Sequence, residues 1–173
     1  MNKGYLAVAA YAATIPAANW MIGNVGTFCV PDGPCLIPLG FGITAPSGVL
    51  MIGLALLLRD AVHETLGARW ALYAIAVGAA LSYLLADPYI AIASLIAFGV
   101  SELSDFAVYS RIRERSRVLG VFASGCVGSI IDSVVFLWLA FGSLAYVEGQ
   151  IVGKIGVTAL AAAALWAYRK YYA

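Results

Sequence analysis

Long apolar stretches, each close to the length of a membrane-spanning helix, alternate with short polar connections along this chain of 173 residues. A helix needs about 20 mostly apolar residues to cross a lipid bilayer. The pattern predicts six such spans, at residues 5–21, 42–62, 70–86, 89–110, 118–141 and 151–168. We therefore expect an all-α integral membrane protein that consists of one six-helix transmembrane domain over residues 1–173.

The longest connection, residues 23–41, is rich in glycine and proline. Its three prolines exclude a continuous helix, so we expect a loop that can dip back toward the membrane. Cys29 and Cys35 lie in this loop with no histidine nearby, which argues against a zinc site. A disulfide and two free thiols are equally favoured at this stage.

Composition supports the membrane assignment. Hydrophobic residues make up 63% of the chain and charged residues 11%, whereas about 25% charged residues is typical of soluble domains. Mean hydropathy is +0.93. The net charge of +1 gives no basis for a nucleic-acid surface, so we expect no nucleic-acid partner. The first apolar stretch has no convincing cleavage site, and we interpret it as a retained span.

Basic residues set the expected orientation. With six spans, both termini share one side of the membrane, and nine of the ten Lys and Arg fall on that side. Cytoplasmic loops carry such an excess, so we expect both termini in the cytoplasm and the 23–41 loop outside. The nine are Lys3, Arg59, Arg69, Arg111, Arg113, Arg115, Arg117, Arg169 and Lys170.

Four ionisable residues, Glu102, Asp105, Asp132 and Lys154, lie deep within the predicted spans. A charge near the bilayer centre costs at least about 2.5–3.5 kcal/mol, so these groups should face the interior of the bundle. Glu102 and Asp105 are three residues apart and share a helix face. We expect Lys154 to be the only buried cation available to these acids. Because buried ion pairs seldom offset their desolvation, a substrate or ion path is favoured over a structural role.

Other polar residues admit two interpretations each. Asp60 and Glu64, with Arg59 beside them, form either part of a binding site or an ion-pair cluster at the cytoplasmic interface. Asn19 and Gln150 either contact a ligand or hydrogen-bond between helices. Carboxylates, amides and a lysine would suit a flat heterocycle with N–H donors, since one carboxylate accepts two hydrogen bonds from a guanine-like edge. Aromatic residues of the same helices, Trp20, Tyr109 and Phe136, would cover its faces.

Five motifs together resemble the queuosine-precursor transporter family, also called the VUT or vitamin uptake transporter family. They stand in order over nearly the whole chain, which makes the resemblance more specific than any single motif would be. The motifs are residues 44–48 (TAPSG), 53–67 (GLALLLRDAVHETLG), 101–111 (SELSDFAVYSR), 128–141 (GSIIDSVVFLWLAF) and 149–154 (GQIVGK).

The resemblance implies a six-helix carrier of the prokaryotic cytoplasmic (inner) membrane, similar to the substrate-binding subunits of energy-coupling-factor transporters. It also implies uptake of 7-deazaguanine bases, such as 7-cyano- or 7-aminomethyl-7-deazaguanine, used to make queuosine in tRNA. No cofactor or metal is expected. The ligand-facing residues that it implies are Asn19, Asp60, Glu64, Glu102, Asp105, Asp132, Gln150 and Lys154.

Alternatives remain at this stage. The chain could carry another small heterocyclic vitamin-like solute, and its transport could be passive, proton-coupled or dependent on an ATPase partner. An intramembrane enzyme is disfavoured because His63, the sole histidine, is expected at the cytoplasmic interface, at the wrong end for Ser101 or Ser129. A third hypothesis is a membrane protein with a purely structural role. Gly149 and Gly153 predict close helix packing within the bundle, with a homodimer seam as the alternative.

Overall fold

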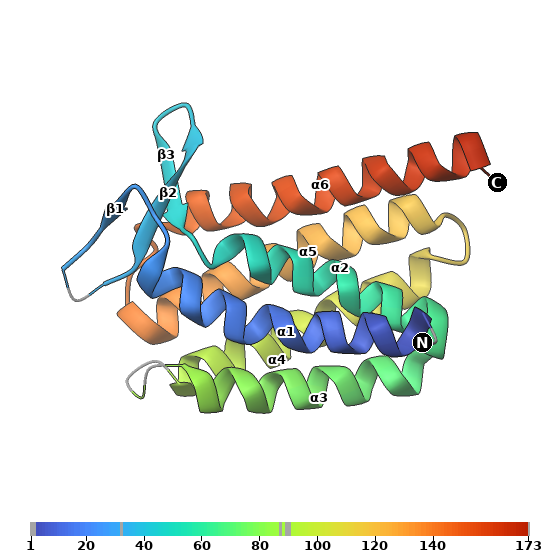
Figure 1. Ribbon diagram of the computed structural model, residues 1–173, viewed down its shortest axis with the longest axis horizontal. Coiled ribbons are helices and arrows are strands. Elements are labelled where there is room, and N and C mark those ends of the chain that lie inside the picture. Colours follow the sequence, from blue (N-terminus) through green and yellow to red (C-terminus); the bar gives the residue numbers. More distant parts are fainter. Residues whose placement is uncertain (1–2, 32, 87, 89–90, 173) are drawn as a thin grey trace.

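The computed structural model describes residues 3–31, 33–86, 88 and 91–172, except for the side chains of residues 165, 168, 169, 171 and 172. Arg169 and the predicted start of the fourth span at residue 89 thus lie outside the described part. The described residues form six helices, the number predicted, and Figure 1 shows the helices running side by side. They are α1 (Lys3–Asn24), α2 (Val49–Leu66), α3 (Ala68–Leu85), α4 (Ala91–Ile112), α5 (Arg117–Phe141) and α6 (Val147–Tyr172).

The chain is an all-α membrane protein, 78% helical. Five helices are long and apolar enough to cross a membrane, and α2 is the exception. Its 18 residues include Arg59, Asp60 and Glu64. A helix with three charges is tolerated here because α2 packs against all five other helices. The bundle itself, rather than lipid, surrounds its polar side chains.

The outer surface of the bundle is apolar. Large hydrophobic side chains are exposed on several helices, including Leu6, Tyr73, Leu84, Ile92, Leu103 and Leu160. Such a continuous apolar exterior would be unfavourable in water and suits a lipid environment. The buried core, by contrast, contains Tyr11, Ile15 and Val62 together with many polar groups.

A small antiparallel sheet replaces the loop expected at residues 23–41. Its strands are β1 (Phe28–Cys29), β2 (Cys35–Gly40) and β3 (Ile43–Pro46), in the order β1-β2-β3. The predicted start of the second span at residue 42 was therefore wrong, because α2 begins at Val49. Apolar residues 43–46 form an edge strand rather than a helix start, and positive φ angles at Gly40, Phe41 and Gly42 make the β2–β3 turn.

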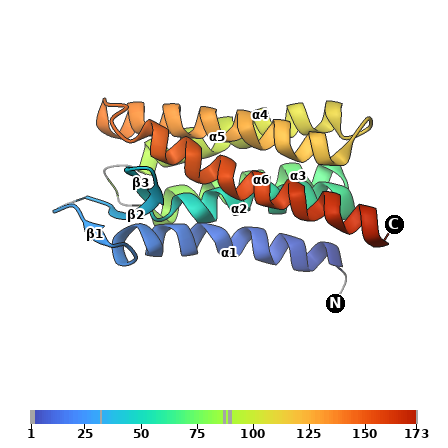
Figure 2. The same ribbon diagram turned by 90° about the horizontal axis from the view of Figure 1, so that it is seen from above.

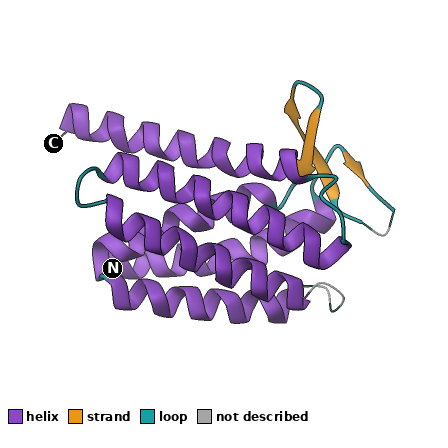
Figure 3. Ribbon diagram, turned by 180° about the vertical axis from the view of Figure 1, so that it is seen from behind, coloured by secondary structure: helices purple, strands orange, loops and turns teal. Residues whose placement is uncertain are grey.

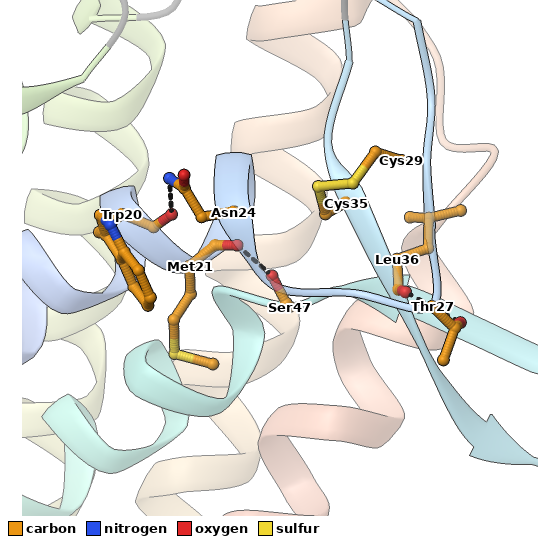
Figure 4. Close-up of a disulfide and its surroundings, with 8 residues drawn as sticks. All are labelled: Trp20, Met21, Asn24, Thr27, Cys29, Cys35, Leu36 and Ser47. Atoms are coloured by element: carbon orange, nitrogen blue, oxygen red, sulfur yellow. Dashed lines mark hydrogen bonds between the residues drawn. A yellow bond between two sulfur atoms is a disulfide. The ribbon is translucent and has the colours of Figure 1, made fainter.

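A disulfide joins β1 to β2 through Cys29 and Cys35, which resolves the alternative left open by the sequence (Figure 4). The sheet is also tied to the bundle, because the Ser47 hydroxyl donates to the Met21 carbonyl of α1 at 2.6 Å. Cys35 and Ala45 are buried. The sheet thus forms a fixed cover over one end of the helices.

Glycines of the last two helices pack inside the bundle. A Cβ atom at Gly153 would stand 2.9 Å from a Val49 methyl, and one at Gly149 would overlap the Thr44 carbonyl of β3. This close packing within the chain was the favoured prediction. The homodimer seam stays a prediction.

Both termini lie at one end of the bundle and the sheet lies at the other (Figures 1 and 2). The view from behind shows the strands gathered beside the first turns of α6 (Figure 3). The molecule therefore has two chemically different ends, one disulfide-linked and one rich in arginine.

Candidate functional site

A lysine near the start of α6 holds the first polar cluster. Lys154 Nζ donates to Asp132 Oδ2 at 2.5 Å, Ser133 Oγ at 2.9 Å and Gln150 Oε1 at 2.8 Å. All three ammonium donors are thus used. On the other side, Ser101 Oγ of α4 lies 3.4 Å from Asp132 Oδ1. We call Asp132, Ser133, Gln150 and Lys154 the Lys154 cluster.

A cavity of about 100 Å³ adjoins this cluster. Lys154 and Gln150 are 1% and 5% exposed, and Asp132 is 8% exposed. The cavity is bounded by α1, the β3–α2 connection and helices α2 to α6, near the end that carries the sheet. Its lining residues are Ala18, Asn19, Ile22, Pro46, Gly48, Val49, Ile52, Ser82, Ser94, Ala97, Phe98, Asp132, Phe136, Gln150 and Lys154.

Asn19 brings an amide from α1 to the same cavity. Its Nδ2 donates to the Ile15 carbonyl one turn earlier, at 2.9 Å, which fixes the carboxamide against its own helix. The side chain lines the cavity and makes no interhelical hydrogen bond to the described residues. Two aromatic rings, Phe98 of α4 and Phe136 of α5, complete the lining.

Two aromatic residues expected at the ligand lie elsewhere. Trp20 is 61% exposed on the outside of α1, although it follows Asn19 in sequence. Tyr109 is buried near the other end and donates to Glu64 at 3.0 Å. Phe98, which the sequence interpretation missed, takes their place in the cavity wall.

A second cluster surrounds Arg59 in the middle of α2. Its Nη1 lies 2.6 Å from Asp60 Oδ1, its Nε donates to Glu102 Oε2 at 3.1 Å, and its Nη2 donates to Asp105 Oδ1. Tyr11 of α1 donates to the other Glu102 oxygen at 3.3 Å. We call Arg59, Asp60, Glu102 and Asp105 the Arg59 cluster. Its four side chains are 0–4% exposed.

Arg59 corrects two expectations. Lys154 is not the only buried cation near the acids, because Arg59 binds Glu102 and Asp105 directly. Nor is Arg59 interfacial, since the guanidinium lies between helices, with its Cζ 5.9 Å from the ring centres of Phe106 and Tyr109. Arg59 is buried because α2 is enclosed by the other helices, which the sequence alone does not show.

His63 is also buried rather than interfacial. It is 4% exposed and stacks on Phe106, with ring centres 5.1 Å apart. Within the described residues, no group of three or more His, Cys, Asp or Glu side chains could hold a metal ion. Ring packing is therefore the visible role of His63.

Glu64 belongs to a third group at the end that carries the termini. Its carboxylate accepts a hydrogen bond from Arg113 at 2.5 Å and lies 3.0 Å from Arg117 Nε. These three residues line an open pocket of about 420 Å³. The Glu64 side chain is 22% exposed. Such partly exposed pairs contribute little to stability, and they mark this end as the interfacial one.

The eight predicted site residues thus divide into three sets. Asn19, Asp132, Gln150 and Lys154 meet at the cavity. Asp60, Glu102 and Asp105 lie in the Arg59 cluster, and Glu64 lies in the arginine group at the opposite end. A cavity with one carboxylate, two amides, an ammonium group and two aromatic rings can bind a small polar heterocycle by hydrogen bonds and stacking.

Comparison with known families gives a match to a transporter family. A family model described as "Putative vitamin uptake transporter" matches residues 82–168, which is half of the chain. The matched stretch contains α4 and α5 entirely, and with them Glu102, Asp105 and Asp132, whereas Arg59 and Asp60 of α2 lie outside it. No curated protein and no solved structure matches the chain. The expected likeness to energy-coupling-factor subunits therefore stays a prediction.

Proposed function

Because the chain belongs to the vitamin uptake transporter family, we propose that it is a carrier of the prokaryotic cytoplasmic membrane that imports queuosine precursors. The solutes would be 7-deazaguanine bases such as 7-cyano- or 7-aminomethyl-7-deazaguanine. The observation that carries this proposal is the cavity beside the Lys154 cluster, where Asp132, Gln150 and Lys154 converge with two phenylalanines.

The chemistry of the cavity complements the edge of such a base. The Asp132 carboxylate can accept from a ring N–H and the adjacent amino group at once. Lys154 Nζ and the Gln150 amide supply donors for a ring carbonyl oxygen. These groups satisfy one another at 2.5 and 2.8 Å, so a ligand would replace protein–protein hydrogen bonds rather than fill unsatisfied ones.

The walls favour a flat ligand. Phe98 and Phe136 lie on neighbouring helices, α4 and α5, and both line the cavity. Aromatic side chains prefer offset or edge-on contact with another ring. A planar bicyclic base would gain from both rings, whereas a linear polar solute would gain little.

Import requires an orientation, and the disulfide supports one. Disulfides persist in oxidising compartments, which supports an orientation with the Cys29–Cys35 end outside and the termini, at the opposite end, in the cytoplasm. A fluorescent protein fused to the C-terminus should then be fluorescent, and an alkaline phosphatase fused there should be inactive. The reverse result would overturn this orientation.

Uptake in cells tests the substrate. Cells unable to synthesise 7-deazaguanines should accumulate labelled 7-cyano-7-deazaguanine when they express the chain. Asp132→Asn should abolish this accumulation, whereas Glu148→Gln, which makes the same chemical change at an exposed position of α6, should not. Undiminished uptake by Asp132→Asn at equal membrane abundance would reject the site.

Competition and reconstitution test the alternatives. An excess of unlabelled heterocyclic vitamin that abolishes deazaguanine uptake would indicate a different solute of the same shape. Transport by the purified chain alone in liposomes would show that no ATPase partner is needed. A loss of uptake on deletion of an ATPase gene would instead identify the chain as a substrate-binding subunit.

A further inference from the structure

The Arg59 cluster contains more acids than its one cation can balance. Three carboxylates, those of Asp60, Glu102 and Asp105, face one guanidinium. If all were ionised, the cluster would carry a formal charge of 1 − 3 = −2. The Lys154 cluster beside it, with one acid and one base, is neutral. Uncompensated charge in a site this deeply buried is strongly unfavourable, and such groups are normally neutralised instead.

Hydrogen bonding distinguishes the acids from one another. Both oxygens of Glu102 have a donor, Tyr11 on one side and Arg59 on the other. Asp105 has Arg59 on Oδ1 only. Asp60 Oδ1 and Asp105 Oδ2 are both fully buried without a hydrogen-bond partner among the described residues, but Asp60 Oδ1 lies 2.6 Å from the Arg59 cation. The less compensated of the two is Asp105 Oδ2. This oxygen faces α5, where a Cβ atom at Gly128 would stand 3.1 Å away. A bare charged oxygen is most costly here, and a proton removes its charge.

We propose that Asp105 binds a proton within the Arg59 cluster and that this proton accompanies the solute through each transport cycle. The inference rests on the proposed carrier function, to which it adds an energy source. It concerns a site without contact to the cavity, because none of the residues Arg59, Asp60, Glu102 and Asp105 lines it.

A metal cation fits the cluster poorly. Sodium would need several oxygen ligands around one point, but the Arg59 guanidinium already occupies the space between the three carboxylates at direct-contact distances. A second cation would also lie beside the positive charge of Arg59. A proton needs no coordination sphere and adds no volume.

The surroundings of the cluster supply charges from several helices. Tyr11 of α1 donates to Glu102. The positive charge of Arg113, at the end of the bundle that carries the termini, acts on His63. The described titratable and charged groups around the cluster are Tyr11 on α1, Asp60, His63 and Glu64 on α2, Glu102 and Tyr109 on α4, Asp132 on α5, Lys154 on α6 and Arg113 after α4. Apart from Arg59, the cations among them already pair with other acids: Lys154 with Asp132 and Arg113 with Glu64.

Helix α4 connects the proton site to the cavity. Phe98 lines the cavity and Ser101 hydrogen-bonds to Asp132, while Glu102 and Asp105 bind Arg59 within the next turn and a half. A shift of α4 that opens or closes the cavity must therefore also change the contacts of Asp105. Through this shared helix, proton binding at Asp105 and solute binding in the cavity would be coupled.

Transport by the purified full-length chain in liposomes tests the coupling. An inward proton gradient should drive accumulation of labelled 7-cyano-7-deazaguanine by the wild type, and a sodium gradient should not. Asp105→Asn mimics the protonated state, so it should retain solute exchange at zero gradient while losing gradient-driven accumulation at least about tenfold. Glu148→Gln, at an exposed carboxyl, should behave like the wild type in both assays.

Infrared spectroscopy tests the bound proton without any solute. The wild type at neutral pH should show the carbonyl stretch of a buried protonated carboxyl group, and Asp105→Asn should lack it while Glu148→Gln retains it. A wild type without this band, accumulation indifferent to the proton gradient, or accumulation driven by sodium would each overturn the proposal. If Asp105→Asn does not fold, Asp105→Glu serves instead, because it keeps a carboxyl group and should shift the frequency of the band. A band that is retained in Asp105→Asn or unshifted in Asp105→Glu would place the proton on another acid and overturn the assignment.

The two proposals fail separately. A wild type that shows the band lost in Asp105→Asn but does not exchange 7-deazaguanines would refute the proposed solute and leave the proton site in place. A wild type that exchanges the solute but lacks the band would refute the proton site alone.

Discussion

Two buried cations, Arg59 and Lys154, organise the polar interior of this bundle, and their surroundings differ. Lys154 has one acidic partner and lies on the wall of a cavity. Arg59 has three acidic partners and lies between helices, outside that cavity. The first arrangement is balanced in charge and accessible, whereas the second is unbalanced and closed.

The difference separates two roles that the sequence presents together. A balanced pair beside a cavity can exchange its internal hydrogen bonds for those of a ligand at small electrostatic cost. An excess of acids in a closed site cannot reach a ligand, but it can gain or lose a proton. Four predictions, from the largest effect to the smallest, test this division.

Removal of the central cation should have the largest effect. Arg59→Gln would leave three buried carboxylates without their cation, and breaking a buried pair in this way costs about 3–5 kcal/mol. The purified variant should unfold at a markedly lower temperature than the wild type. Arg69→Gln, at an exposed arginine of α3, should change the free energy of unfolding by less than about 0.5 kcal/mol. Equal melting of both variants would show that Arg59 does not hold the cluster together.

The Lys154 cluster should respond differently to single and double neutralisation. Asp132→Asn and Lys154→Gln each leave one buried charge unpaired, so each should lower thermal stability. The double variant removes both charges and should recover most of that loss. Solute uptake should stay at least about tenfold below the wild type in all three variants, since charge-assisted hydrogen bonds contribute about 1.5–3 kcal/mol. Restored uptake in the double variant would show that the pair is structural.

Much of the fold could be predicted from the sequence, because lipid imposes a simple rule on spanning segments. Apolar length identified six helices, and the buried positions of Glu102, Asp105, Asp132 and Lys154 followed from the cost of charge in a bilayer. The β-sheet could not be predicted in this way. Prolines marked residues 23–41 as a loop, and residues 42–46 were taken for the start of the second span, whereas a turn at Gly40 and Gly42 pairs residues 35–40 with residues 43–46 as strands.

The sequence could not predict which buried acids pair with which cation inside the bundle. Spacing placed Glu102 and Asp105 on one helix face, but the cation that they meet depends on how α2 is rotated against α4. For Arg59, with Asp60 and Glu64 close behind it on α2, the sequence left a binding site and an interfacial ion-pair cluster equally open. The useful signal was that α2 has acids and a base yet too few polar residues to face water.

The aromatic wall of the cavity should have a moderate effect. Phe136→Ala removes one of the two rings that line it, and a stacking contact contributes about 0.5–1.5 kcal/mol. The half-saturating solute concentration for uptake should rise about two- to tenfold. Phe122→Ala, on the same helix but 41% exposed, should leave this value unchanged. Equal effects of the two variants would place the solute away from Phe136.

An effect no larger than that of Phe136→Ala is expected at Asn19, where the chain offers a closely matched control. Asn19 and Asn24 both lie on α1, and each donates its Nδ2 to the carbonyl four residues earlier, at 2.9 and 2.8 Å. Asn19 lines the cavity and Asn24 does not. Replacement of either by alanine removes the same local hydrogen bond, but only Asn19→Ala removes an amide from the solute. Loss of one neutral hydrogen bond, about 0.5–1.5 kcal/mol, should raise the half-saturating concentration about two- to tenfold for Asn19→Ala and not for Asn24→Ala. Because the local backbone contact is common to both variants, an equal change in the two would assign the effect to α1 itself and remove Asn19 from the binding site.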